Sequence, residues 1–95
     1  MEWTWVGEIV EWRGPSPHHF VMTPDFVSLA LREISPALTY GWGAIPVEVV
    51  LGATTFTTSL FPRGHDYAVP LKLAVRSAEG VSLGDRVHIA IRVRT

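Results

Sequence analysis

The stretch AIPVEVVLGATTFTTSLF (residues 44–61) decides the fold, because it has the features of a β-hairpin. In its first half every second side chain is aliphatic, which predicts a strand with one buried face. That face would carry Ile45, Val47, Val49 and Leu51. Gly52-Ala53 has the length and the leading glycine of a two-residue type II′ turn. The run of β-branched and aromatic residues that follows, residues 54–61, predicts the returning strand.

The same two-residue period occurs near both ends of the chain. RVHIAIRVR (residues 86–94) predicts a last strand whose charged side chains face water. Its inward side chains would be Val87, Ile89, Ile91 and Val93. WTWVGEIVEW (residues 3–12) predicts a long first strand, and HHFVMT (residues 18–23) predicts a second. The proline-rich residues 13–17 predict the turn between them.

Two stretches carry helix signals. TPDFVSLALREI (residues 23–34) has Thr23 at the N-cap position and Pro24 at the first helical position. Its apolar stripe would contain Phe26, Val27, Ala30, Leu31 and Ile34. A second helix is expected to open at Pro70 and to end at Gly80. Its inward side chains would be Leu71, Ala74, Val75 and Ala78.

Before that helix, PRGHD (residues 62–66) predicts a turn and YAV (residues 67–69) a short strand. The count is then about six strands and two short helices. This predicts a mainly β fold, a small closed or half-closed β-barrel, because closure removes exposed strand edges. A chain of 95 residues makes one domain at most, so we expect residues 1–95 to form a single barrel domain.

Composition excludes several classes of function. The chain has no cysteine, which excludes disulfides, thiolate metal sites and thiol nucleophiles. No apolar run approaches the roughly 20 residues that cross a bilayer. The first residues lack the basic and apolar regions of a signal peptide. We therefore expect a cytoplasmic protein without membrane association, since a small domain without disulfides fits a reducing compartment.

The net charge is only −1, but it is unevenly distributed. Residues 1–59 contain two Lys and Arg against six Asp and Glu, whereas residues 60–95 contain six against three. The basic part of the chain could meet an anionic ligand. The whole chain is too balanced for a strong non-specific nucleic-acid binder, which makes nucleic acid a disfavoured partner without excluding it.

Candidate catalytic groups lie in TTSLFPRGHDYAVPLK (residues 57–72). Ser59 is either a nucleophile or an ordinary strand residue, and it lacks the G-x-S-x-G turn of hydrolases. His65 and Asp66 are adjacent in a turn, a placement that rarely gives triad geometry. Asp66 is expected to cap its own turn instead. We predict no catalytic residue, and a small hydrolase using Ser59 or His65 is the least favoured function.

Candidate binding residues occur in the same region. Lys72 and Arg76 are four apart and share a helix face, which is either a solvated basic face or a place for an anion. If the barrel brings Ser59, Arg63, Lys72 and Arg76 together, they would form an anion-binding corner. Trp42 lies between two glycines, where core packing explains a tryptophan less well, so it is a candidate ligand contact.

The remaining aromatic and imidazole side chains leave alternatives open. Trp3 and Trp5 share one strand face, where they either line a pocket in the barrel mouth or fill the core. His18 and His19 would point to opposite faces of their strand, and no H-x-H or H-x-x-x-H spacing occurs. We therefore expect no metal and no cofactor.

Several phrases resemble the bacterial family called domain-of-unknown-function 1905. They are the W-x-G-P-x-P turn at residues 12–17, the G-x-G loop at 41–43, TSLFP at 58–62, YAVPLKLAVR at 67–76 and GDRV at 84–87. The sequence departs from the family pattern at His18, His19 and Val69, and the two histidines put a ligand shared at the second strand in doubt. The resemblance implies a small β-barrel, sometimes joined to a bacteriocin-protection domain, and no established activity.

A weaker similarity links VPLKLAVRSAEGVSLGDRVHIAI (residues 69–91) to the AbrB/MazE-type swapped-hairpin unit. That similarity implies a dimeric barrel that binds DNA, but a shared fold does not carry function with it. Our leading hypothesis is a non-catalytic module, monomer or homodimer, that binds a small anionic or aromatic ligand or a protein partner. The alternative is a DNA-binding dimer of the swapped-hairpin type.

Overall fold

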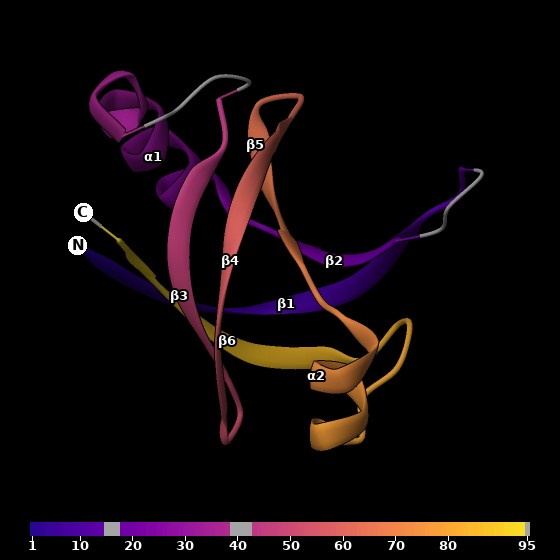
Figure 1. The fold of residues 1–95 in the computed structure, drawn as a ribbon. Helices are drawn as coiled ribbons and strands as arrows, with labels where there is room; N and C mark the ends of the chain where they lie inside the picture. The colour runs from indigo at the N-terminus through magenta and orange to yellow at the C-terminus, as the bar shows by residue number, and fades with distance from the viewer. Residues whose placement is uncertain (15–17, 39–42, 95) are drawn as a thin grey trace.

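The computed structural model describes residues 1–14, 18–38 and 43–94. Within these ranges six strands and two helices follow one another in the order that the sequence predicts (Figure 1). The elements are β1 (Glu2–Trp12), β2 (His18–Met22), α1 (Asp25–Leu38), β3 (Ile45–Leu51), β4 (Thr54–Arg63), β5 (Asp66–Pro70), α2 (Leu73–Glu79) and β6 (Arg86–Val93). The predicted turn at residues 13–17 lies mostly outside the described residues.

The six strands form a closed barrel in the order β1-β2-β5-β4-β3-β6, with β6 pairing back to β1. All six pairs are antiparallel. The long, bent β1 closes the barrel, because its first part pairs with β6 and its last part with β2 (Figure 1). The predicted mainly β barrel is confirmed, in its closed form.

The two-residue alternation along β3 and β6 determines which of their side chains are buried in the core. In β3 the side chains of Ile45, Val47, Val49 and Leu51 are all buried. The four aliphatic side chains of β6 are also buried, and the charged ones between them are exposed. Cross-strand neighbours such as Val49 and Ile91 bring the two sets into contact across the β3–β6 pair. The predicted inward faces of both strands are confirmed.

Two hairpins turn through a glycine with positive φ. Gly52 has φ 57°, as a primed two-residue turn requires, and confirms the turn predicted from Gly52-Ala53. Gly64 has φ 63° and opens a second two-residue turn, between β4 and β5. The predicted five-residue turn PRGHD is therefore wrong in extent: Pro62 and Arg63 belong to β4, and Asp66 begins β5.

Helix α1 is longer than predicted, and the face that it buries differs from the predicted apolar stripe. It runs from Asp25 to Leu38 and includes Pro36, whose ring is exposed in the last turn. A proline there removes one helix hydrogen bond but does not clash with the core. Of the predicted apolar stripe, Val27 and Leu31 are buried, whereas the Phe26 side chain is 59% exposed.

Helix α2 begins later than predicted. Pro70 is the last residue of β5, where it pairs with Phe20 of β2. The helix has only seven residues, so only Val75 is buried in it, while Leu71 is buried just ahead of it. Ala74 and Ala78, predicted to point inward, are exposed. Gly80 ends the helix with φ 64°, as predicted.

A chain of hydrogen bonds joins α1 to β5. The Tyr67 amide donates to the Thr23 hydroxyl at 2.9 Å. The hydroxyls of Thr23 and Ser28 lie 2.7 Å apart, and Ser28 donates to the Asp66 carboxylate at 2.6 Å. Because the Ser28 hydroxyl already donates its proton to Asp66, the Thr23 hydroxyl is the donor in its hydrogen bond with Ser28. Asp66 therefore accepts a hydrogen bond from α1, a role that the sequence did not indicate.

Candidate functional site

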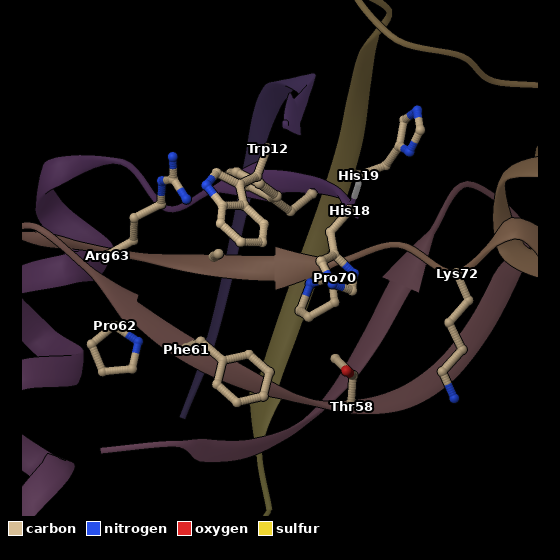
Figure 2. A pocket seen from close by; sticks show the side chains of 11 residues that line it. Trp12, His18, His19, Thr58, Phe61, Pro62, Arg63, Pro70 and Lys72 are labelled. Carbon is tan, nitrogen blue, oxygen red and sulfur yellow. The ribbon is translucent and has the colours of Figure 1, made fainter. Parts of the chain in front are cut away.

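A hollow of about 610 Å³ lies against the outer wall of the barrel, across β1, β2, β5 and β4 (Figure 2). We call it the outer groove. In this wall Val21 and Val69 point into the core, and their neighbours Phe20, Ala68 and Pro70 line the groove on the other side. At these positions of β2 and β5, strand alternation therefore separates core side chains from groove side chains.

Strand register assembles the groove from distant parts of the chain. Trp12 of β1 pairs with His18 of β2. Phe20 pairs with Pro70 across the β2–β5 ladder, and Phe61 pairs with Ala68 across the β4–β5 ladder. The apolar lining consists of Trp12, Phe20, Phe61, Pro62, Ala68 and Pro70. The polar lining consists of His18, His19, Thr58, Arg63 and Lys72.

Trp12 forms one rim of the groove. Its ring stacks on the His18 imidazole, with centroids 6.1 Å apart and planes inclined by 9°. A Cβ atom on Gly14 would lie 2.5 Å from the nearest Trp12 ring atom. Only glycine lets the indole lie over the backbone here, which gives the W-x-G phrase a physical reason. The Trp12 side chain remains 42% exposed.

Arg63 lies over an aromatic ring at another part of the groove. Its Cζ atom is 5.1 Å from the centroid of the Phe20 ring, a cation–π contact. Phe20 is 5% exposed, so the ring is fixed and the guanidinium is the movable partner.

A second hollow, of about 250 Å³, adjoins the outer groove and is called the side hollow. The two share His18, His19, Pro70 and Lys72, and the side hollow adds Leu71, Leu73 and Arg76. The Leu71 amide donates to the His19 carbonyl at 2.9 Å, which fixes the approach to α2 against β2. The Arg76 Nε donates to the Leu71 carbonyl at 3.2 Å.

The charged side chains that line the two hollows are of one sign. Among the residues that the structure describes, no Asp or Glu lines either hollow. Among the described residues, Arg63, Lys72 and Arg76 take part in no ion pair. Glu11 lies near the groove, but its carboxylate oxygens face Arg13 at 3.9 Å and His19 at 3.7 Å. An anion would therefore meet unpaired cations at this surface.

The structure brings together some of the predicted binding residues. Arg63 and Lys72 both line the outer groove, at opposite sides of the view in Figure 2. Lys72 and Arg76 both line the side hollow. Ser59 lines neither; it lies on β4 opposite Pro46 of β3. Trp42 lies outside the described residues.

Sequence reasoning missed the aromatic part of the groove. Trp12, Phe20 and Phe61 belong to three different strands, and nothing in their spacing shows that these strands share a wall. His18 and His19 are the first two residues of β2, and both line both hollows. The sequence feature that could have indicated the groove is the W-x-G phrase followed closely by two histidines.

Of the two alternatives for the N-terminal tryptophans, a pocket lining or core packing, the structure shows core packing. Trp5 is buried in the core, and Trp3 is half-buried and packs against it. Neither lines a hollow described here. The Trp5 Nε1 is buried without a hydrogen-bond partner among the residues that the structure describes.

The other candidate catalytic and metal-binding side chains are dispersed over the described residues. His65 is exposed in the β4–β5 turn, and its neighbour Asp66 is bonded to Ser28. Across residues 1–14, 18–38 and 43–94, no three His, Asp or Glu side chains gather where they could hold a metal ion. Within the same ranges, neither helix has the length and apolar character to span a bilayer.

The fold and the groove define a small, closed antiparallel β-barrel with a cationic, aromatic-lined hollow on its outer wall. The family model described as Domain of unknown function (DUF1905) matches residues 6–91 of the 95, so the chain belongs to this family and the resemblance is confirmed. Comparison with curated proteins finds no match.

Proposed function

We propose that this chain is a non-catalytic binding module that holds a small anionic or aromatic ligand in the outer groove. The observation that carries the proposal is the joint lining of one hollow by aromatic side chains and by cations that take part in no ion pair among the described residues. The DNA-binding dimer, the small hydrolase and the protein partner stay predictions, as do the bacterial origin and the cytoplasmic location.

The dimensions and exposure of the groove support a small-molecule ligand. Its volume of about 610 Å³ falls in the range of roughly 300–1,000 Å³ that is common for ligand pockets. Trp12 and Phe61 remain 42% and 50% exposed at its rim. A ligand that covers them gains about 25 cal/mol for each Å² of apolar surface removed from water.

The proposal is tested by filling the groove. Ala68 lies on the groove floor with 9% exposure, and its side chain points away from the core. We expect Ala68→Phe to occupy the ligand volume and to weaken binding of the dye 1-anilinonaphthalene-8-sulfonate, an aromatic anion, about tenfold, which corresponds to about 1.4 kcal/mol.

The matched control is Val50→Phe, which adds the same ring to an exposed position of β3 away from the groove. It should leave dye affinity at the wild-type value. Fluorescence titration measures both variants, and circular dichroism checks that each is folded. Equal affinities in Ala68→Phe and wild type would contradict the proposal.

A further inference from the structure

We infer that the outer groove and the side hollow form one two-part site for a planar aromatic anion. The ring of the ligand lies in the outer groove against the Arg63–Phe20 pair. The anionic group lies in the side hollow on Lys72 and Arg76. This inference rests on the proposed function and adds the class of ligand and the end of the site that takes its charge.

The two hollows are adjacent. They share four lining residues from two segments, His18 and His19 of β2 and Pro70 and Lys72 at the end of β5. Lys72 therefore faces both spaces. A ligand whose ring fills the outer groove can extend a charged substituent past Lys72 without leaving the protein surface.

Arg76 is held ready for an anion. Its Nε atom donates to the Leu71 carbonyl at 3.2 Å, and its side chain is half-buried. This bond fixes the guanidinium plane and leaves the two Nη groups without partners among the described residues. A fixed guanidinium loses little further entropy when it binds a carboxylate, sulfonate or phosphate in two-pronged geometry. The Lys72 ammonium supplies a second cation beside it.

Arg63 has a different part in the site. Its Cζ atom lies over the Phe20 ring, 5.1 Å from the centroid. The guanidinium can also stack on a second ring, since guanidinium groups stack on aromatic faces. Figure 2 shows Arg63 and Lys72 on opposite sides of the groove, with Trp12 between them along the upper edge and Phe61 along the lower edge. The ring therefore belongs at the Arg63 end and the charge at the Lys72 end.

The lining excludes a cationic ligand. In the described part of the chain no carboxylate lines either hollow, and the nearby Glu11 carboxylate is already placed between Arg13 and His19. A cation in the side hollow would meet two like charges with no compensating group. A neutral aromatic ligand would leave the cations of the side hollow unused.

Two dyes with the same rings test the inference. One is 1-anilinonaphthalene-8-sulfonate, and the other is N-phenyl-1-naphthylamine, which lacks the sulfonate. We expect the wild-type protein to bind the sulfonate about tenfold more tightly, the gain of one charge-assisted contact. Lys72→Gln with Arg76→Gln should abolish this preference and leave the affinity for the neutral dye unchanged. Arg63→Gln should weaken both dyes, and Arg86→Gln, an exposed arginine of β6, should weaken neither.

A second measurement needs no variant. Amide chemical-shift changes in the wild-type protein that the sulfonate dye causes and the neutral dye does not should centre on residues 71–76. Equal affinities for the two dyes, or sulfonate-specific shifts centred on Arg63, would overturn the inference and leave the proposed function intact. Tighter binding of dodecyl sulfate than of the aromatic sulfonate would overturn the assignment of a planar ring. If Ala68→Phe weakens neither dye, the proposed function itself fails.

Discussion

Gly14 controls the Trp12 indole at the rim of the groove. An added Cβ would lie 2.5 Å from the ring, and this is closer than carbon atoms approach in folded proteins. The indole would have to move, and its stacking on His18 would be lost. The position of the Trp12 indole at the rim thus depends on the lack of a side chain at Gly14.

We predict that Gly14→Ala weakens binding of 1-anilinonaphthalene-8-sulfonate several-fold and costs about 1 kcal/mol of stability or less, a typical value for a change at the surface. In a Trp12→Ala background the same change should have no further effect, because the clash is then gone. The four affinities of this cycle, measured by fluorescence titration, decide the matter. An equal loss in both backgrounds would place the effect of Gly14 in the backbone.

Ser28 has a structural role that is not evident from its residue type alone. It is 1% exposed, and it stands between the hydroxyl of Thr23 and the carboxylate of Asp66. A buried serine near an aspartate can suggest catalysis, but every proton in this chain of hydrogen bonds has a fixed acceptor. The chain fastens the first turn of α1 to β5.

We predict that Ser28→Ala lowers the free energy of unfolding by about 1–3 kcal/mol, because it removes the acceptor of the buried Thr23 hydroxyl proton and the donor to the half-buried Asp66 carboxylate. Ser77→Ala, at an exposed position of α2, is the control and should change stability by less than about 0.5 kcal/mol. Urea unfolding measures both. If the two variants are equally stable, the hydrogen-bonded chain contributes nothing.

Helix α2 is tied to the barrel at both of its ends. At its start the Leu71 amide bonds to the His19 carbonyl, beside the side hollow. At its end the Glu79 carboxylate accepts hydrogen bonds from the Ala53 amide and the Thr54 hydroxyl, in the turn between β3 and β4. With seven residues the helix is too short to be stable alone, so these ties hold the basic residues of the side hollow in place.

We predict that Glu79→Ala lowers stability by about 1 kcal/mol and speeds hydrogen exchange at the Ala53 amide, which loses its acceptor. Glu33→Ala, at an exposed position of α1, removes the same charge and should leave that amide unchanged. Exchange measured by nuclear magnetic resonance reports on the single amide, and equal rates in both variants would show that the tie is not formed in solution.

The barrel shows which features could be predicted from sequence. The inward residues of β3 and β6 followed from local alternation, since burial on one face is a property of each strand alone. The groove could not be predicted in this way. Its walls depend on pairs such as Phe20 with Pro70, which lie far apart in the chain. The same pairing made Pro70 a strand residue, although its local signal was that of a helix start.

Closure of the whole barrel depends on β1 at Ile9. Up to Glu8 the strand pairs with β6, and from Ile9 it pairs with β2. The backbone of Ile9 still holds the turn before β6, through its amide to the Asp85 carbonyl at 2.9 Å and through its carbonyl to the Gly84 amide at 2.8 Å. Its side chain is fully buried in the core. This one residue therefore joins the two parts of the sheet.

We predict that Ile9→Ala lowers the free energy of unfolding by about 2–5 kcal/mol, the usual cost of a cavity left by a buried aliphatic side chain. Val10→Ala, the half-buried neighbour on the other face of β1, should cost much less. Because the strands form a single closed ring, tryptophan fluorescence and far-ultraviolet circular dichroism should follow one coincident transition in both variants. Two separate transitions in Ile9→Ala would show that the halves of the barrel unfold independently and that β1 does not couple them.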